Sequence, residues 1–142
     1  MEITPGNVRQ WSRLGSRGVF GQAILSLAEK KQDLMVLSAD LGNSSGLDRF
    51  KTTYPDKFIN VGIAEQNMIG VAAGLAKGGF VVFATSFAPF ISMRSSEQIR
   101  MNLGYMNLNV KAVAIGSGVS MAFLGVSHYG IEDAAIMRSI PN

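Results

Sequence analysis

The stretch Val61-Gly62-Ile63-Ala64-Glu65-Gln66-Asn67-Met68 is the most informative junction in this 142-residue chain. The apolar run that leads into it, residues 58–61, predicts a strand, and the segment rich in small residues that it opens, residues 64–77, predicts a helix. Glu65 then falls in the first turn of the helix, where the helix dipole stabilises an acidic side chain by about 0.3–1 kcal/mol. Considered alone, Glu65 is explained by this dipole effect.

Strands and helices are predicted to alternate on both sides of this junction. The predicted helices cover residues 14–31, 47–54, 64–77, 89–101 and 131–140, and the predicted strands cover residues 34–39, 58–61, 80–84 and 110–115. Such alternation over short loops is typical of an α/β fold with a three-layer, doubly wound parallel sheet. Ligands of this fold bind at the carboxyl ends of the strands.

The composition excludes several classes of protein. With 47% hydrophobic and 16% charged residues, the chain is that of a folded domain rather than of a disordered segment. It has no cysteine and a single histidine, which excludes disulfides, thiolate metal sites and histidine-rich metal sites. The net charge of +3 is scattered, which gives little support to nucleic-acid binding but suits a small anionic ligand.

The sequence predicts neither a membrane span nor a secretory signal. Its most apolar segment, residues 70–93, is interrupted by Lys77, two glycines and Pro89. The first residues carry Arg9 and Arg13 around Trp11 and lack an apolar core of the signal-peptide kind. We therefore expect a cytoplasmic protein.

The chain ends directly after the predicted helix 131–140, and no strand follows. Because an α/β unit normally returns to the sheet, we expect a subunit or fragment whose remaining elements lie elsewhere. Residues 1–15 are interpreted as an N-terminal lead segment. Residues 16–142 are interpreted as one domain that is incomplete at its C-terminus.

The run Gly-Ile-Ala-Glu-Gln-Asn at residues 62–67 resembles the signature of the pyrimidine-binding domain of transketolase-family enzymes. Three further segments, residues 37–41, 85–90 and 127–142, occur in the order and spacing of that family. The resemblance implies the thiamin diphosphate-binding fold. It also implies a thiamine-diphosphate-dependent transferase that moves a two-carbon ketol-type unit, with a small-molecule ketose or 2-keto substrate.

The resemblance implies roles at the cofactor for four residues. The residue that matches Glu65 hydrogen-bonds N1′ of the aminopyrimidine and stabilises the imino tautomer, which removes the C2 proton of the thiazolium. Phe87 is expected to face the aminopyrimidine ring, and Phe90 to line the same pocket. Asp40 is expected to contact the cofactor region and the dimer interface. Without the resemblance, core packing explains the phenylalanines, and a loop or cap position explains Asp40.

Three residues are implied at the substrate. Arg17 and Ser44 match positions that hold substrate phosphate or hydroxyl groups, and a guanidinium suits a phosphate; Arg17 is equally compatible with a solvated helix face. His128 matches a position that points at the substrate, where an imidazole can donate or relay a proton. A lone loop histidine otherwise has no implied role.

Three features depart from the family pattern. Met93 stands where an aromatic residue is frequent, Gly116 stands where a histidine is usual, and Ala122-Phe123-Leu124-Gly125 replaces a Gly-Glu-Asp-Gly run. Two polar substrate contacts are thereby lost. We expect a less hydroxylated substrate than pentose phosphates, or a different binding mode.

The resemblance also implies a partner chain. The family binds the diphosphate through Mg²⁺ with a Gly-Asp-Gly motif, which this sequence does not contain. We therefore expect an N-terminal diphosphate-binding transketolase subunit that holds Mg²⁺, in a homodimer or heterotetramer, and no activity from this chain alone. Gly70, Ala73 and Gly74 recur on neighbouring turns, which predicts close packing of another chain against helix 64–77.

Two alternatives remain open at the level of the sequence. Gly116-Ser117-Gly118 follows an apolar strand, as in a dinucleotide-binding Rossmann-like module, although Met121 replaces the third glycine of that fingerprint. The other alternative is a non-catalytic scaffold subunit with the same fold.

Overall fold

Four parallel strands form the central sheet of the protein, whose computed structural model describes residues 3–142. The strands are β1 (Leu34–Ser38), β2 (Phe58–Asn60), β3 (Val81–Phe87) and β4 (Val110–Ile115), in the spatial order β2-β1-β3-β4. β1 and β3 lie at the centre, with Leu34 opposite Val81 in a parallel register. The parallel α/β sheet predicted from the sequence is confirmed.

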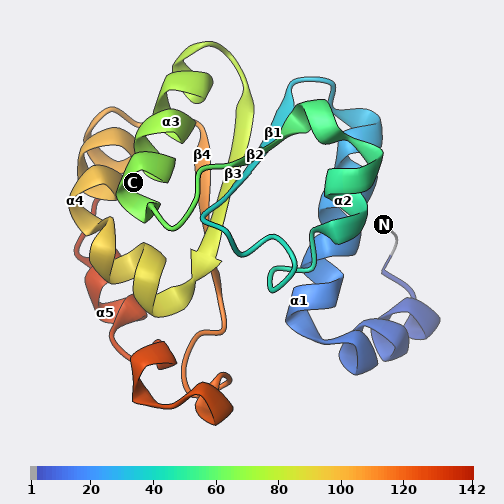
Figure 1. Cartoon of the computed structure of the whole chain (residues 1–142). Helices are drawn as coiled ribbons and strands as arrows, with labels where there is room; N and C mark the ends of the chain where they lie inside the picture. The colour runs from blue at the N-terminus through green and yellow to red at the C-terminus, as the bar shows by residue number, and fades with distance from the viewer. Residues whose placement is uncertain (1–2) are drawn as a thin grey trace.

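Helices cover both faces of this sheet, which makes three layers (Figure 1). On one face lie α1 (Pro5–Lys30) and α2 (Asp48–Thr53), and on the other lie α3 (Glu65–Lys77), α4 (Ser96–Ile99) and α5 (Asp133–Arg138). Because successive strand residues point to opposite faces, β1 serves both layers. Val36 packs among residues of α1 and α2, whereas Leu37 packs among residues of α3.

Each face of the sheet has its own buried apolar cluster. The cluster under α1 and α2 contains Ile24, Ala28, Leu34, Val36, Leu47 and Phe50. The cluster under α3 contains Leu37, Ala39, Met68, Ile69, Ala72, Val82, Ala84, Ile91 and Ile99. Burial of one large apolar side chain contributes about 1.5–3 kcal/mol, so these clusters hold the layers together. In the described part of the chain, no helix is both long and apolar enough to cross a bilayer.

α1 begins earlier than the helix predicted at residues 14–31. Thr4 caps it, because its Oγ1 accepts a hydrogen bond from the backbone N–H of Asn7 (3.2 Å), and Pro5 is its first residue. Gly15 interrupts the helix with a φ of 77°, a conformation that glycine adopts without strain. The lead segment 1–15 is therefore largely helical; its first two residues lie outside the described residues, and its boundary stays a prediction.

β3 is longer than predicted. The predicted strand ends at residue 84, whereas β3 continues through Thr85, Ser86 and Phe87, and these residues pair with β4 as far as Ile115. The hydroxyl groups of Thr85 and Ser86 are buried, and both have partners. Thr85 Oγ1 lies 3.5 Å from Ser45 Oγ, and Ser86 Oγ donates a hydrogen bond to Glu65. Polar partners contributed by other elements thus extend a strand whose apolar run ends at residue 84.

The helix predicted at residues 89–101 forms, but it is not one regular α-helix. A π-helical turn at Phe90–Arg94 precedes α4, and a second one at Arg100–Tyr105 follows it. Two buried serines bond the carbonyls four residues earlier at 2.6 Å, Ser92 to Ala88 and Ser95 to Ile91. Side-chain bonds of this kind compete with the backbone ladder and distort helices. π-helical turns are frequent at functional sites.

Candidate active site at the carboxyl ends of the strands

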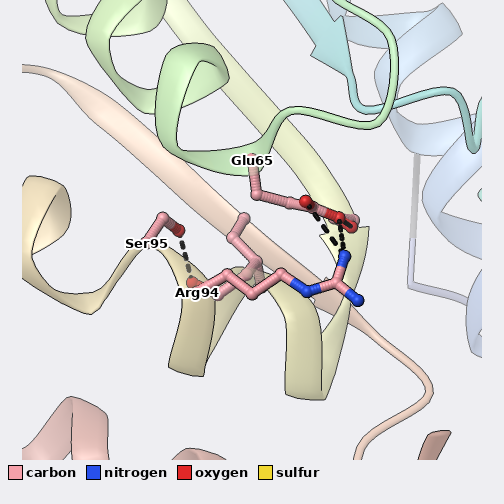
Figure 2. Close-up of polar contacts among 5 residues, drawn as sticks. Glu65, Arg94 and Ser95 are labelled. Atoms are coloured by element: carbon pink, nitrogen blue, oxygen red, sulfur yellow. Dashed lines mark hydrogen bonds and ion pairs between the residues drawn. The ribbon is translucent and has the colours of Figure 1, made fainter. Parts of the chain in front are cut away.

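Glu65 is the first residue of α3, and its side chain is only 3% exposed. Ser86 Oγ, at the end of β3, donates a hydrogen bond of 3.0 Å to Glu65 Oε1. Arg94 Nη1 lies 3.3 Å from Glu65 Oε2, and Figure 2 shows its guanidinium reaching the carboxylate from the helical segment after β3. A helix-dipole role requires no burial, so the dipole effect alone does not explain this carboxyl group.

Three aromatic rings meet near the carboxyl end of β3. The ring centroids of Phe87 and Phe90 are 6.0 Å apart, and the ring of His128 lies 5.6 Å from Phe87 and 5.2 Å from Phe90. All three pairs are edge-on, an arrangement that aromatic pairs prefer to a face-to-face stack. The structure thus brings the single histidine to the two phenylalanines that the sequence analysis placed at the cofactor.

His128 reaches the phenylalanines because the loop after β4 folds back over the end of β3. An antiparallel bridge between Gly118 and Gly130 closes this loop, with two backbone hydrogen bonds of 2.9 Å. A Cβ atom on Gly130 would lie 2.7 Å from the Cβ of Ala88, so only glycine permits this approach. Ser127 Oγ lies 3.0 Å from His128 Nδ1 and helps to orient the ring.

Arg94 joins the acidic part of the site to its aromatic part. Its Cζ lies 4.0 Å from the centroid of the Phe90 ring, in a cation–π contact. The side chain is 48% exposed and lines a cavity of about 500 Å³ with residues 63–67. Neither Arg94 nor Ser86 is among the residues that the family resemblance implies at the cofactor or the substrate. The four-residue spacing from Phe90 to Arg94 was a usable signal, because residues four apart share a helix face.

Asp40 lies at the carboxyl end of β1, in the left-handed region with a φ of 59°. Asn60 holds it there: Asn60 Nδ2 donates to Asp40 Oδ1, and Asn60 Oδ1 accepts from the backbone N–H of Asp40, both at 2.9 Å. The same Oδ1 accepts from the N–H of Gly62 (3.1 Å), in the loop that leads to Glu65. Asp40 is therefore coupled to this loop through Asn60, a residue to which the sequence assigns no role.

Arg17 and Ser44 lie on the α1 side of the sheet. A Cβ atom on Gly46 would lie 2.7 Å from the carbonyl oxygen of Arg17, so α1 packs closely on the loop that carries Ser44. Arg17 is exposed and Ser44 is half-buried. Over residues 3–142, no hydrogen bond or ion pair joins either side chain to the Glu65 cluster, so the structure forms two groups rather than one.

The dinucleotide-binding alternative is not supported. That fingerprint requires a helix to begin at the glycine turn. After Gly116-Ser117-Gly118 the chain instead forms short 3₁₀ turns, and α5 begins only at Asp133. Among the described residues, no group of three or more histidine, aspartate or glutamate side chains is arranged to hold a metal ion.

Comparisons with known proteins agree with this geometry. Residues 13–142 match the family model described as "Transketolase, pyrimidine binding domain". The chain is 48% identical, over 128 residues, to the protein of Methanocaldococcus jannaschii named "Putative transketolase C-terminal section", covering 90% of this chain and 40% of that protein. It is 41% identical to the 6-deoxy-6-sulfo-D-fructose transketolase subunit SqwH of a Clostridium species, covering 88% of this chain and 39% of that subunit.

A solved structure described as "Split gene transketolase, inactive beta4 tetramer" superposes on the chain with a TM-score of 0.76. Its sequence is 43% identical, and the match covers 89% of this chain and 40% of the solved chain. The chain thus spans about 40% of the length of these relatives.

Proposed function

Because the chain belongs to the family of transketolase pyrimidine-binding domains, we propose that it binds the aminopyrimidine half of thiamine diphosphate and completes a transketolase active site with a partner subunit. The observation that supports this most is the buried carboxyl group of Glu65, which Arg94 links to the paired rings of Phe90 and Phe87. These groups fit an aminopyrimidine, which is flat and carries nitrogen atoms at its edge. A carboxyl group can bond the edge, and the aromatic rings can contact the face.

When bound, thiamine diphosphate supplies a nucleophilic carbon that accepts and passes on a two-carbon ketol-type unit. We propose that Glu65 holds a proton at N1′ of the aminopyrimidine, and that Ser86 fixes the orientation of its carboxyl group. Phe87 and Phe90 exclude water from the ring. His128, which contacts both rings, donates or relays a proton at the substrate.

The remaining site residues are proposed for the rim of the site. Asp40, fixed by Asn60, contacts the cofactor region and the subunit interface. Arg17 and Ser44 bind phosphate or hydroxyl groups of a ketose or 2-keto substrate. Phe123 is 81% exposed where the family carries an acidic residue, which supports a substrate with fewer hydroxyl groups than a pentose phosphate.

The partner is proposed to be an N-terminal diphosphate-binding transketolase subunit that holds Mg²⁺. On α3, Cβ atoms added to Gly70 and Gly74 would meet nothing within 4 Å, so this surface is open to another chain. Ala73, grouped with them in the sequence analysis, is instead buried within the domain. The similar split gene transketolase is described as an inactive tetramer of one chain, which supports self-association and inactivity without the partner. We propose a homodimer or heterotetramer in the cytoplasm.

Calorimetry with thiamine diphosphate and Mg²⁺ tests the proposal. The chain, a diphosphate-binding partner subunit and their mixture are titrated in parallel. Binding should occur in the mixture and be weak or absent with the chain alone. No binding in a mixture that forms a complex, or binding of NAD(H) in its place, would contradict the proposed function.

A further inference from the structure

Arg94 makes the two contacts that the proposed function assigns to the aminopyrimidine ring. Its Nη1 lies 3.3 Å and 3.4 Å from the two carboxylate oxygens of Glu65, and its Cζ lies 4.0 Å from the ring centroid of Phe90. A guanidinium resembles an aminopyrimidine in being planar, in carrying N–H donors at its edge and in packing flat on aromatic rings. One group at a time can fill the space between this carboxylate and this ring.

The Arg94 side chain is held weakly enough for a ligand to displace it. Its distances to Glu65 exceed the roughly 2.7–2.9 Å of a strong charge-assisted bond, and the side chain is 48% exposed. In the part of the chain that the structure describes, the guanidinium has no hydrogen-bond acceptor other than Glu65. It borders the open cavity of about 500 Å³ at the start of α3, so it can move into solvent without breaking any further hydrogen bond, and it gives up only its contact with the Phe90 ring.

We propose that Arg94 is a placeholder for the aminopyrimidine: its guanidinium occupies the site between Glu65 and Phe90 in the free subunit and leaves when thiamine diphosphate binds. In the free subunit it gives the buried carboxylate a partner of opposite charge. In the complex its departure weakens net cofactor binding, because the ion pair must be broken. The inference rests on the proposed function. It adds that Arg94 competes with the aminopyrimidine for the site between Glu65 and Phe90.

Calorimetric titration of thiamine diphosphate into the complex with the partner subunit and Mg²⁺ tests this role. Arg94→Met keeps the apolar stem but removes the guanidinium, and should bind the cofactor about two- to fivefold more tightly, the range expected from losing a half-exposed ion pair. Arg100→Met, an exposed arginine of the same segment, is the matched control and should bind as the unmodified chain does.

A second measurement, thermal melting of the chain without cofactor, should show a lower Tm for Arg94→Met than for Arg100→Met, since Glu65 loses a partner. Arg94→Lys keeps the charge but not the planar group, so it should fold normally and bind with intermediate affinity. Unchanged or weaker binding by both Arg94 variants would overturn the placeholder role alone. Failure of the unmodified complex to bind the cofactor would overturn the proposed function and this inference together.

Discussion

At the scale of single residues, the centre of the candidate site is one buried acid and the side chains that hold it. A carboxylate removed from water is destabilising unless hydrogen bonds or a counter-charge compensate for its lost hydration. Glu65 receives one of each, from Ser86 at 3.0 Å and from Arg94 at 3.3 Å. The Ser86 bond is fully buried and the Arg94 contact is half exposed, so Ser86 should contribute more to folding.

Replacement of Ser86 by alanine should therefore lower the free energy of unfolding by about 1–3 kcal/mol, the cost of leaving a buried charged acceptor without its donor. Urea denaturation of the isolated chain measures this loss. Ser12→Ala removes an exposed hydroxyl group that bonds a carbonyl within α1, and it should change stability by less than about 0.5 kcal/mol. Equal losses in the two variants would show that the Ser86 bond does not support Glu65.

At the scale of elements, the carboxyl end of β3 connects the layers. Thr85 meets the loop after β1, Ser86 meets α3, and Phe87 meets the rings of Phe90 and His128. The order and type of the elements were predictable, because they follow from apolar periodicity along the chain. The last residues of β3 and the π-helical turns were not predictable from the sequence, because they depend on hydrogen bonds to partners that no local pattern specifies.

The same limit applies to the candidate site. Glu65, Phe87, Phe90 and His128 were selected through a family resemblance; the structure brings the three rings together and links Glu65 to Phe90 through Arg94. Local patterns alone left each of them with an ordinary explanation. Arg94 was missed because its contacts link a helical turn after β3 to the start of α3, an arrangement that only tertiary packing creates.

Gly130→Ala should move the loop that carries His128, since the added Cβ would lie 2.7 Å from the Cβ of Ala88. His128 is the single histidine, so its ring proton signals are readily identified by NMR. Ring currents of Phe87 and Phe90 should shift these signals in the unmodified chain, and the shifts should shrink in the variant. Gly70→Ala, at an open position, should leave them unchanged. Unaltered His128 signals in Gly130→Ala would contradict the loop packing.

At the scale of the whole molecule, one side of the domain is the proposed contact surface for another chain. The exposed residues Ile63, Gly70 and Gly74 follow the outer surface of α3 from its start, beside the cavity at Glu65. Small residues permit close approach of a second backbone. Assembly and cofactor binding are therefore expected to use the same side of the molecule.

Gly74→Leu should block assembly with the partner subunit while leaving the isolated chain folded, because the position is open in the domain. Sedimentation velocity of the mixture measures the loss of complex, and circular dichroism checks the fold. Gln10→Leu adds the same side chain at an exposed position in the first part of α1, which lies far from α3 (Figure 1), and should assemble normally. Assembly of Gly74→Leu to the extent of the control would place the interface elsewhere.

The central claim, that Glu65 exchanges a proton with the aminopyrimidine, is tested most directly by the C2 proton of bound thiamine diphosphate. Its exchange with deuterium is measured by NMR in the reconstituted complex, for the unmodified chain and for Glu65→Gln. Glutamine keeps the size of the side chain and an acceptor for Ser86, but it cannot share the N1′ proton. Cofactor binding should persist while exchange slows by at least about a hundredfold, as for loss of a general acid–base group. An unchanged exchange rate would contradict the account and favour a scaffold subunit.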